Sequence, residues 1–270
     1  MYIETVTLVQ AARKRQRAAH GSPENHGWFL FLSTGLLCLI TVYLFAQNFF
    51  GEEMWIIHEG YPGGSGQYYA DNAAVWYQTM GSAASVVMNW MSDAFLIYRV
   101  YTVWEQNLFV IILPSVLYVG TVVLGILTCY YSGRPGGDFF VGIAPHIALG
   151  YSAVGIAMNV LCSSLICWYI VCETPWSFSG AAAIAPNRGA LNAVTIVVES
   201  MLPYTLFGVA YVTLLGLNSP VAILFLSLYV MFTCLSPQMI MLRVLRGRGW
   251  KKDNLSLSER SALFDHGPQV

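Results

Sequence analysis

The chain alternates long apolar stretches with short polar connections. Six stretches reach the length of about 20 residues that a helix needs to cross the hydrocarbon core of a bilayer. Five are nearly uncharged, and one carries two ionisable residues toward one end. The pattern predicts an all-α, polytopic transmembrane bundle with six complete spans over residues 28–245. The predicted spans are Trp28–Phe50, Ala74–Trp104, Leu108–Tyr131, His146–Val171, Leu191–Leu217 and Val221–Leu245.

Basic residues are segregated to one side of this arrangement. If the N-terminus lies in the cytoplasm and the spans alternate, Arg134 is the only one of the 13 Lys and Arg residues placed outside. Such a bias orients membrane proteins during insertion. We therefore expect both termini to be cytoplasmic, in the plasma membrane or an endomembrane. The expected partner of the basic clusters is anionic lipid of the bilayer, not nucleic acid.

The two ends of the chain differ from the spans. Met1–Ala12 is moderately apolar and is followed by the basic run Arg13–Arg17, the reverse of the order in a secretory signal. We interpret residues 1–27 as a cytoplasmic segment that is the remnant of a first helix, in a chain derived from a seven-helix protein or an incomplete copy of one. A short amphipathic surface helix is the alternative. Residues 246–270 predict a cytoplasmic polar tail.

The loop Gly51–Asn72 is rich in glycine and aromatic residues. We favour interfacial anchoring for its aromatic side chains, with a lid over a ligand as the alternative. The six cysteines lie in or at the ends of spans, which favours packing over disulfide bonding. Zinc-ligand spacing, a phosphate-binding glycine loop and a nucleophile elbow are all missing from the sequence, so we expect no metal and no cofactor.

Ionisable residues inside the spans are the candidates for function, because they are costly in the bilayer. Asn89, Ser92 and Asp93 are spaced by three and four residues, so they share one helix face. Glu199 lies at a comparable depth in a later span. A structural hydrogen bond or a conformational latch is the favoured role of both carboxyls, with a ligand or proton site and a catalytic acid as alternatives. The ligand or latch candidates are Asn89, Asp93, Tyr98, Arg99, His146, Glu199 and Tyr204.

One string resembles a known family. Ser92-Asp93-Ala94-Phe95-Leu96-Ile97-Tyr98-Arg99, continuing to Trp104, is similar to the third-helix signature of seven-helix membrane proteins from mushroom-forming fungi. Glu199-Ser200, and Ser236-Pro237-Gln238 followed by Arg243, fit the same pattern. The resemblance covers roughly residues 28–250. This basidiomycete family is largely uncharacterised and receptor-like, and the present chain departs from it by lacking most of the first helix.

The resemblance implies a receptor-like scaffold that senses a small or lipophilic ligand, with an unknown cytoplasmic partner. Arg99 would then form a latch that pairs with an acid in one conformation. Its pocket would open under the Gly51–Asn72 loop, with His146 at the mouth. The alternative is a membrane-embedded enzyme similar to small terpene cyclases, in which Asp93 and Glu199 line one pocket as proton donors. We favour a non-enzymatic role, and a transporter ranks last.

Overall fold

The computed structural model describes residues 26–72, 74–105, 107–133, 143–173, 177–179, 183–185, 188–217, 219 and 221–241, with Ile3 and Thr7. The predicted tail 246–270 lies outside the described residues, as does most of the predicted segment 1–27. The chain divides into two compact units, and the larger one is Leu36–Pro237. All seven candidate residues belong to this larger unit.

The all-α prediction is confirmed: the described chain is a bundle of long helices. Each predicted span corresponds to one helix, and its described ends lie within a few residues of the predicted ones. The elements are α2 (His26–Glu52), the π-helix η1 (Glu53–Ile57), α3 (Gly64–Asn72), α4 (Trp76–Val103), α5 (Leu108–Ser132), α6 (Ala144–Glu173), β1 (Ser177–Ser179), β2 (Ala183–Ala185), α7 (Arg188–Gly216) and the last helix, Ala222–Met241.

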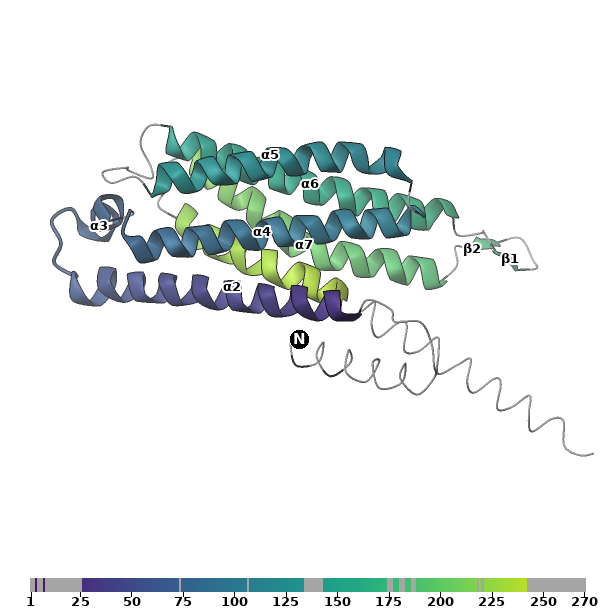
Figure 1. Cartoon of the computed structure of the whole chain (residues 1–270), viewed down its shortest axis with the longest axis horizontal. Helices are drawn as coiled ribbons and strands as arrows, with labels where there is room; N and C mark the ends of the chain where they lie inside the picture. Colours follow the sequence, from purple (N-terminus) through teal and green to yellow (C-terminus); the bar gives the residue numbers. More distant parts are fainter. Residues whose placement is uncertain are drawn as a thin grey trace, which may run out of the picture. The chain divides into compact units, whose positions relative to one another are not determined.

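The tight connection between α4 and α5 is built from local hydrogen bonds. Glu105 adopts a φ of 50°, in the left-handed region, and reverses the chain. Asn107 then caps α5, because its side chain accepts a hydrogen bond from the Phe109 amide at 3.2 Å. The Asn107 amide donates to the Trp104 carbonyl at 3.0 Å. These bonds set α4 and α5 side by side as antiparallel neighbours (Figure 1).

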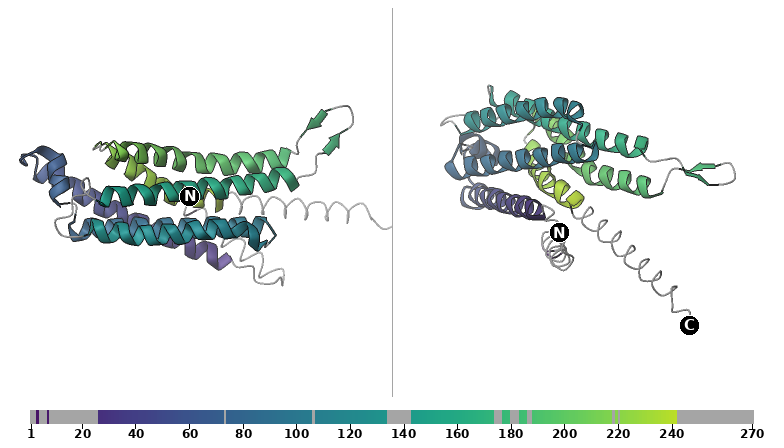
Figure 2. Two further views of the ribbon diagram at one scale, coloured as in Figure 1. Left: turned by 90° about the horizontal axis from the view of Figure 1, so that it is seen from above. Right: turned by 45° about the vertical axis from the view of Figure 1, so that its right-hand side comes forward.

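Helices α4, α5, α6 and α7 pack in sequence, and α4 also contacts α6 (Figures 1 and 2). Small residues allow the helices to approach closely. A Cβ on Gly125 of α5 would lie 2.9 Å from Val86 Cγ1 and 3.0 Å from Trp90 Nε1 of α4. The Trp90 indole donates a hydrogen bond to the Thr121 carbonyl at 3.4 Å, across the same crossing. Glycine is therefore required where these two helices meet.

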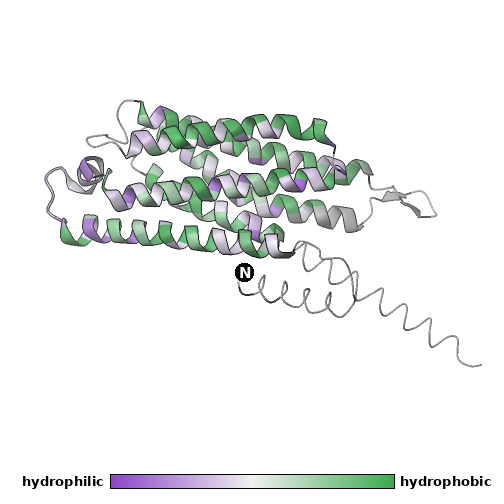
Figure 3. Ribbon diagram, viewed as in Figure 1, coloured by the Kyte–Doolittle hydropathy of each residue, from purple (hydrophilic) through white to green (hydrophobic). Residues whose placement is uncertain are grey.

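The outward face of α5 is apolar, as expected for contact with lipid (Figure 3). Its exposed side chains recur at helical spacing: Phe109, Ile112, Leu113, Val116, Val119, Val123 and Ile126. Within the described residues, five helices are long and apolar enough to cross a membrane. The 28-residue α4 is long enough but not among them, because polar residues such as Asn89 and Asp93 lower its hydropathy. The bundle is that of a multi-pass membrane protein.

The larger unit has two differently built ends (Figures 1 and 2). At one end η1 and α3 form a cap, defined here as Glu53–Asn72. At the other end β1 and β2 pair antiparallel, with Phe178 opposite Ile184. In the sequence this connection, Glu173–Asn187, is distinguished only by its many small residues. A two-stranded hairpin of three residues per strand gives too short an alternation to be recognised in the sequence.

Candidate functional site

The centre of the bundle holds a buried carboxyl on α4. Asn89, Ser92 and Asp93 all face inward, and Asp93 is only 1% exposed. The prediction that these three residues share one face is confirmed. The Asn89 amide nitrogen donates a hydrogen bond to Asp93 Oδ2 at 3.4 Å, one helical turn away. An ionised carboxyl at such a position is costly, which makes Asp93 a candidate site residue.

Three tyrosines from other helices surround this carboxyl. Tyr151 comes from α6, Tyr204 from α7 and Tyr229 from the last helix, and all three are buried. The Tyr204 and Tyr229 hydroxyls lie 2.7 Å apart and share a hydrogen bond. Each of the three tyrosines interacts electrostatically with Asp93. We call Asn89, Asp93, Tyr151, Tyr204 and Tyr229 together the polar centre.

Gly155 of α6 makes room for the polar centre. A Cβ at this position would lie 3.5 Å from each of three polar atoms: Asn89 Nδ2, the Tyr204 hydroxyl and the Tyr229 hydroxyl. The α6 backbone is therefore in direct contact with polar groups from three other helices. A larger side chain would occupy the space in which these groups converge.

Two polar atoms of the polar centre make no hydrogen bond to another described residue. In the described part of the chain, no donor reaches Asn89 Oδ1, and the Tyr151 hydroxyl also lacks a partner of good geometry. The Tyr151 hydroxyl nevertheless lies beside the Asn89 side chain. A buried polar atom without a partner costs about 1–3 kcal/mol. Such a cost at the point where four helices meet makes the polar centre a candidate site.

Four sequence-predicted residues lie away from the polar centre. Tyr98 is 43% exposed, and Glu199 and His146 are also exposed. Arg99 is half-buried, with its guanidinium 5.7 Å from the centre of the Phe95 ring. The structure thus groups Asn89, Asp93 and Tyr204 and separates them from the other four candidates. The expectations that Asp93 and Glu199 line a common pocket and that His146 lies at a pocket mouth stay predictions.

Helix geometry explains why these four side chains point in other directions than Asp93, Tyr151 and Tyr204. Glu199 precedes Tyr204 by five residues, as His146 precedes Tyr151, and five residues turn a helix by about 140° relative to the inward side chain. Tyr98 follows Asp93 by five residues and Arg99 follows it by six, which turns them about 140° and 120° from it. Similar depth along a helix does not imply proximity, because the direction around the axis differs.

The residues missed by sequence reasoning carry a periodic signal. Tyr151, Gly155, Asn159 and Cys162 recur on α6 at spacings of four, four and three, and all four are buried. Tyr204, Gly208, Tyr211 and Leu215 recur similarly on α7. Because residues spaced in this way share one face, the two rows indicate inward-facing positions. Tyrosine does not stand out in the sequence, because it is common in spans and carries no formal charge.

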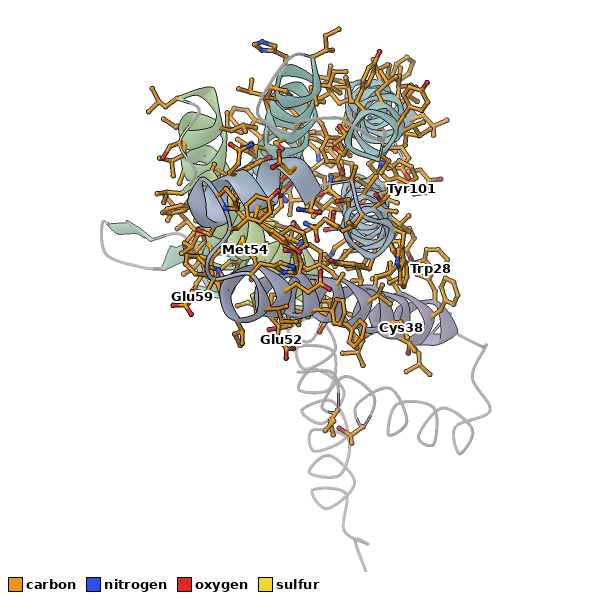
Figure 4. The ribbon with its side chains drawn as sticks, turned by 90° about the vertical axis from the view of Figure 1, so that its left-hand side faces the viewer. Trp28, Cys38, Glu52, Met54, Glu59 and Tyr101 are labelled. Atoms are coloured by element: carbon orange, nitrogen blue, oxygen red, sulfur yellow. The ribbon has the colours of Figure 1, made fainter. Side chains whose placement is uncertain are left out.

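The cap is folded around an aromatic cluster, which contains Phe50, Tyr68, Tyr69 and Tyr77. The Glu53 carboxylate accepts hydrogen bonds from the hydroxyls of Tyr77 and Tyr68, the latter at 3.4 Å. Met54 points toward the interior beside α3, whereas Glu52 and Glu59 point away from it (Figure 4).

Burial raises the pKa of the Tyr69 hydroxyl in the cap to about 12. Trp55 of the cap and Trp76 at the start of α4 are exposed, and the anchoring role of the loop's aromatic residues stays a prediction. Tyr68 and Tyr69 have a different role, because they are buried and hold the cap together.

On the side of the polar centre that faces the hairpin, the interior holds both apolar side chains and the buried polar residues Asn159, Ser200 and Ser236. Leu96 and Val100 of α4 and Ile166 of α6 are buried there. Near this end the Trp104 indole donates a hydrogen bond to the Leu165 carbonyl at 3.2 Å, which ties α4 to α6.

The described residues contain no group of three or more His, Cys, Asp or Glu side chains placed to hold a metal ion. Comparison with protein-family models, with curated proteins and with solved structures gives no match to this chain. The resemblance to fungal seven-helix proteins stays a prediction.

Proposed function

We propose that this multi-pass membrane protein is receptor-like and senses a small ligand at the polar centre. The observation that carries the proposal is Asn89 Oδ1, which has no partner among the described residues and lies beside the buried Asp93 carboxyl where four helices meet. A site assembled from several helices responds to a ligand as a unit. A ligand that binds one packing of these helices better than another shifts the balance between them.

The chemistry of the site favours a ligand that donates hydrogen bonds. The Asp93 carboxylate and Asn89 Oδ1 are acceptors, and the tyrosine hydroxyls can also accept. The tyrosine rings provide π-faces suited to a positive charge. A small lipophilic amine supplies donors, charge and apolar surface together, and is the ligand class that this set of side chains fits best.

The alternative of an enzyme with two proton-donating carboxyls receives no support from the described residues. Glu199 is exposed on α7, whereas Asp93 is buried. A single buried carboxyl surrounded by hydroxyls suits recognition of a donor. The ordering of the function classes therefore stays as the sequence predicts, with a receptor-like role first.

The test is ligand-dependent thermal stabilisation of the purified full-length protein in lipid nanodiscs. The probes are small lipophilic primary amines and their N-acetylated counterparts, which keep the size but lose the charge. We expect some amines to stabilise the wild type, by about 2.7 kcal/mol at a hundredfold excess over the dissociation constant. The N-acetylated compounds should have little effect.

The variant Asp93→Asn is expected to abolish this stabilisation, because it removes the charge that pairs with the amine. Tyr130→Phe is the matched control, since Tyr130 lies on an exposed face of α5. The proposal is wrong if no amine stabilises the wild type, or if Asp93→Asn retains the full effect.

A further inference from the structure

Helix α7 is interrupted near its middle by Pro203. Because a proline has no amide hydrogen, Pro203 cannot donate to the carbonyl four residues earlier, as a residue of a regular α-helix does. A second feature lies at the same level. The Thr205 hydroxyl donates to the Met201 carbonyl at 3.1 Å, a kind of side-chain bond that bends helices. The α7 backbone is therefore weakest between a hairpin-side part, residues 188–202, and a cap-side part, residues 204–216.

Two buried hydrogen bonds to the last helix flank this proline. On its hairpin side the Ser236 hydroxyl donates to the Ser200 carbonyl at 3.0 Å, and it also lies 2.9 Å from the Met201 sulfur. On its cap side the Tyr204 and Tyr229 hydroxyls share the 2.7 Å hydrogen bond of the polar centre. The last helix therefore bridges the interruption, with one bond to each part of α7.

The last helix is itself held in place where it bridges α7. The Cys234 thiol, two residues before Ser236, donates to the Leu36 carbonyl of α2 at 3.7 Å. On the cap side, Gly208 of α7 packs so closely that a Cβ on it would lie 2.9 Å from the Tyr229 ring. The last helix and the cap-side part of α7 are thus closely packed against each other.

The two helices carry their prolines at different places relative to these bonds. In α7, Pro203 lies between the two bonded residues, Ser200 and Tyr204. In the last helix, Pro237 comes after both bonded residues, so the stretch between them contains no proline. All of these residues belong to the larger unit, which ends at Pro237. An uninterrupted stretch of helix therefore lies beside an interrupted one and supports it.

The strength of the bond between Ser236 and Ser200 suits a contact that forms and breaks. A neutral hydrogen bond within a protein changes an equilibrium by about fivefold. Hydrogen bonds between membrane-spanning helices have a similarly modest effect. Such a bond favours one arrangement of two helices without fixing it.

We propose that α7 hinges at Pro203 and that the Ser236 hydroxyl holds its hairpin-side part in the position seen in the structure. When the bond from Ser236 to Ser200 breaks, the hairpin-side part tilts about the proline, while the bond between Tyr204 and Tyr229 keeps the cap-side part in place. Because the hairpin-side part directly follows the hairpin along the chain, the hinge gives this end of the larger unit two arrangements (Figure 1). The hinge requires no ligand and does not rest on the proposed receptor-like role.

The test is hydrogen–deuterium exchange of the α7 amides, with the full-length protein in lipid nanodiscs and no ligand present. Ser236→Ala removes the hydroxyl that holds the hairpin-side part. We expect the amides of this part to exchange about fivefold faster in the variant, because exchange reports local opening of the helix. The amides of the cap-side part should exchange at the wild-type rate. A bond that only stabilised the bundle would instead affect both parts of α7 alike.

Pro203→Ala restores the missing amide hydrogen and so distinguishes a hinge from an ordinary contact. Alone, this variant should slow exchange in the hairpin-side part relative to the wild type. In the double variant with Ser236→Ala, loss of the hydroxyl should change the rate by less than about twofold, because a continuous helix no longer depends on its neighbour for support.

Thr233→Val on the last helix is the matched control. Thr233 is buried like Ser236, but its hydroxyl donates to the Tyr229 carbonyl of its own helix at 3.0 Å. The substitution removes a bond within the last helix, so the exchange of the α7 amides should be unchanged.

Faster exchange that is confined to the hairpin-side part in Ser236→Ala and disappears in the double variant supports the proposal. It is overturned by an unchanged rate in Ser236→Ala, by equal acceleration on both sides of Pro203 or in Thr233→Val, or by the same acceleration with and without the proline. An unchanged rate in Pro203→Ala alone also contradicts the hinge, and this result does not require Ser236→Ala to fold. Because no ligand is present, failure here leaves the amine-stabilisation experiment unaffected.

Discussion

At Gly155 the absence of a side chain determines how three polar groups approach α6. The space is just sufficient for one methyl group, because a Cβ would meet its three nearest atoms at 3.5 Å, an ordinary contact distance. Gly208 of α7 differs. A Cβ there would lie 2.8 Å from Ile156 Cδ1 and 2.9 Å from Tyr229 Cε2. Two glycines near the same tyrosine are thus under different steric constraints.

These constraints predict a ranking of alanine variants. Gly208→Ala should destabilise the protein by about 1–3 kcal/mol, since overpacking displaces Ile156 or Tyr229. Gly155→Ala should stay within about 1 kcal/mol of the wild type, and Gly150→Ala, with open space around its Cβ, should be neutral or stabilising. Thermal unfolding in nanodiscs measures the ranking. A Gly155→Ala variant less stable than Gly208→Ala would contradict it.

The sequence is informative about the candidate site only where a polar residue stands out against an apolar span. Asn89 and Asp93 are recognisable in this way, together with the fact that they share a face. Tyr151 and Tyr229 are not, because a tyrosine in a span is equally compatible with an interior and an interfacial position. To decide between these positions, one must know how each helix is rotated about its own axis. That rotation is set by contacts such as the one between Gly208 and Ile156, which involve residues far apart in the sequence.

Among the elements, the cap is held by specific side-chain interactions outside the spans. Glu53 bonds Tyr77 and Tyr68, His58 stacks on Tyr68 at a centroid distance of 4.8 Å, and the Tyr61 hydroxyl donates to Asp71 at 2.9 Å. The long helices were predictable from apolar length alone. The nine-residue α3 was not, because it is polar and its place depends on these long-range contacts.

The interactions of Glu53 predict that the cap loosens when this carboxylate is neutralised. Glu53→Gln should weaken two hydrogen bonds to a charged acceptor, each worth about 1.5–3 kcal/mol when fully formed. Hydrogen–deuterium exchange of the α3 amides is the measurement, and we expect faster exchange in this variant. Glu52→Gln is the matched control, because Glu52 is exposed and points away from the interior (Figure 4). Equal exchange in the two variants would contradict the assigned role of Glu53.

For the molecule as a whole, the structure places the cap and the hairpin at opposite ends of the larger unit (Figure 1). The sequence adds a charge difference between these ends. Glu53, Glu59 and Asp71 belong to the cap, and Arg188 follows the hairpin directly. The distribution of basic residues thus predicts that the cap faces away from the cytoplasm and the hairpin faces it.

This orientation can be tested with inserted N-glycosylation acceptor sequences, since only sites in the lumen or outside the cell are modified. An acceptor sequence inserted at the exposed Glu59 in the cap should be glycosylated. The same sequence inserted after Ser179 in the hairpin should not be. Glycosylation at the hairpin and not at the cap would reverse the predicted topology.

The direction in which the chain leaves α2 toward α3 depends on the number of residues in the π-helical turn η1. Its hydrogen bonds span five residues, as in the 3.0 Å bond from the His58 amide to the Glu53 carbonyl. A π-turn accommodates one residue more than the α-helix that it interrupts. Loss of one residue here would shorten this turn and rotate the rest of the cap by about 100° about the axis of α2. Insertions and deletions in Glu53–Ile57 should therefore be tolerated far less well than substitutions at its exposed positions.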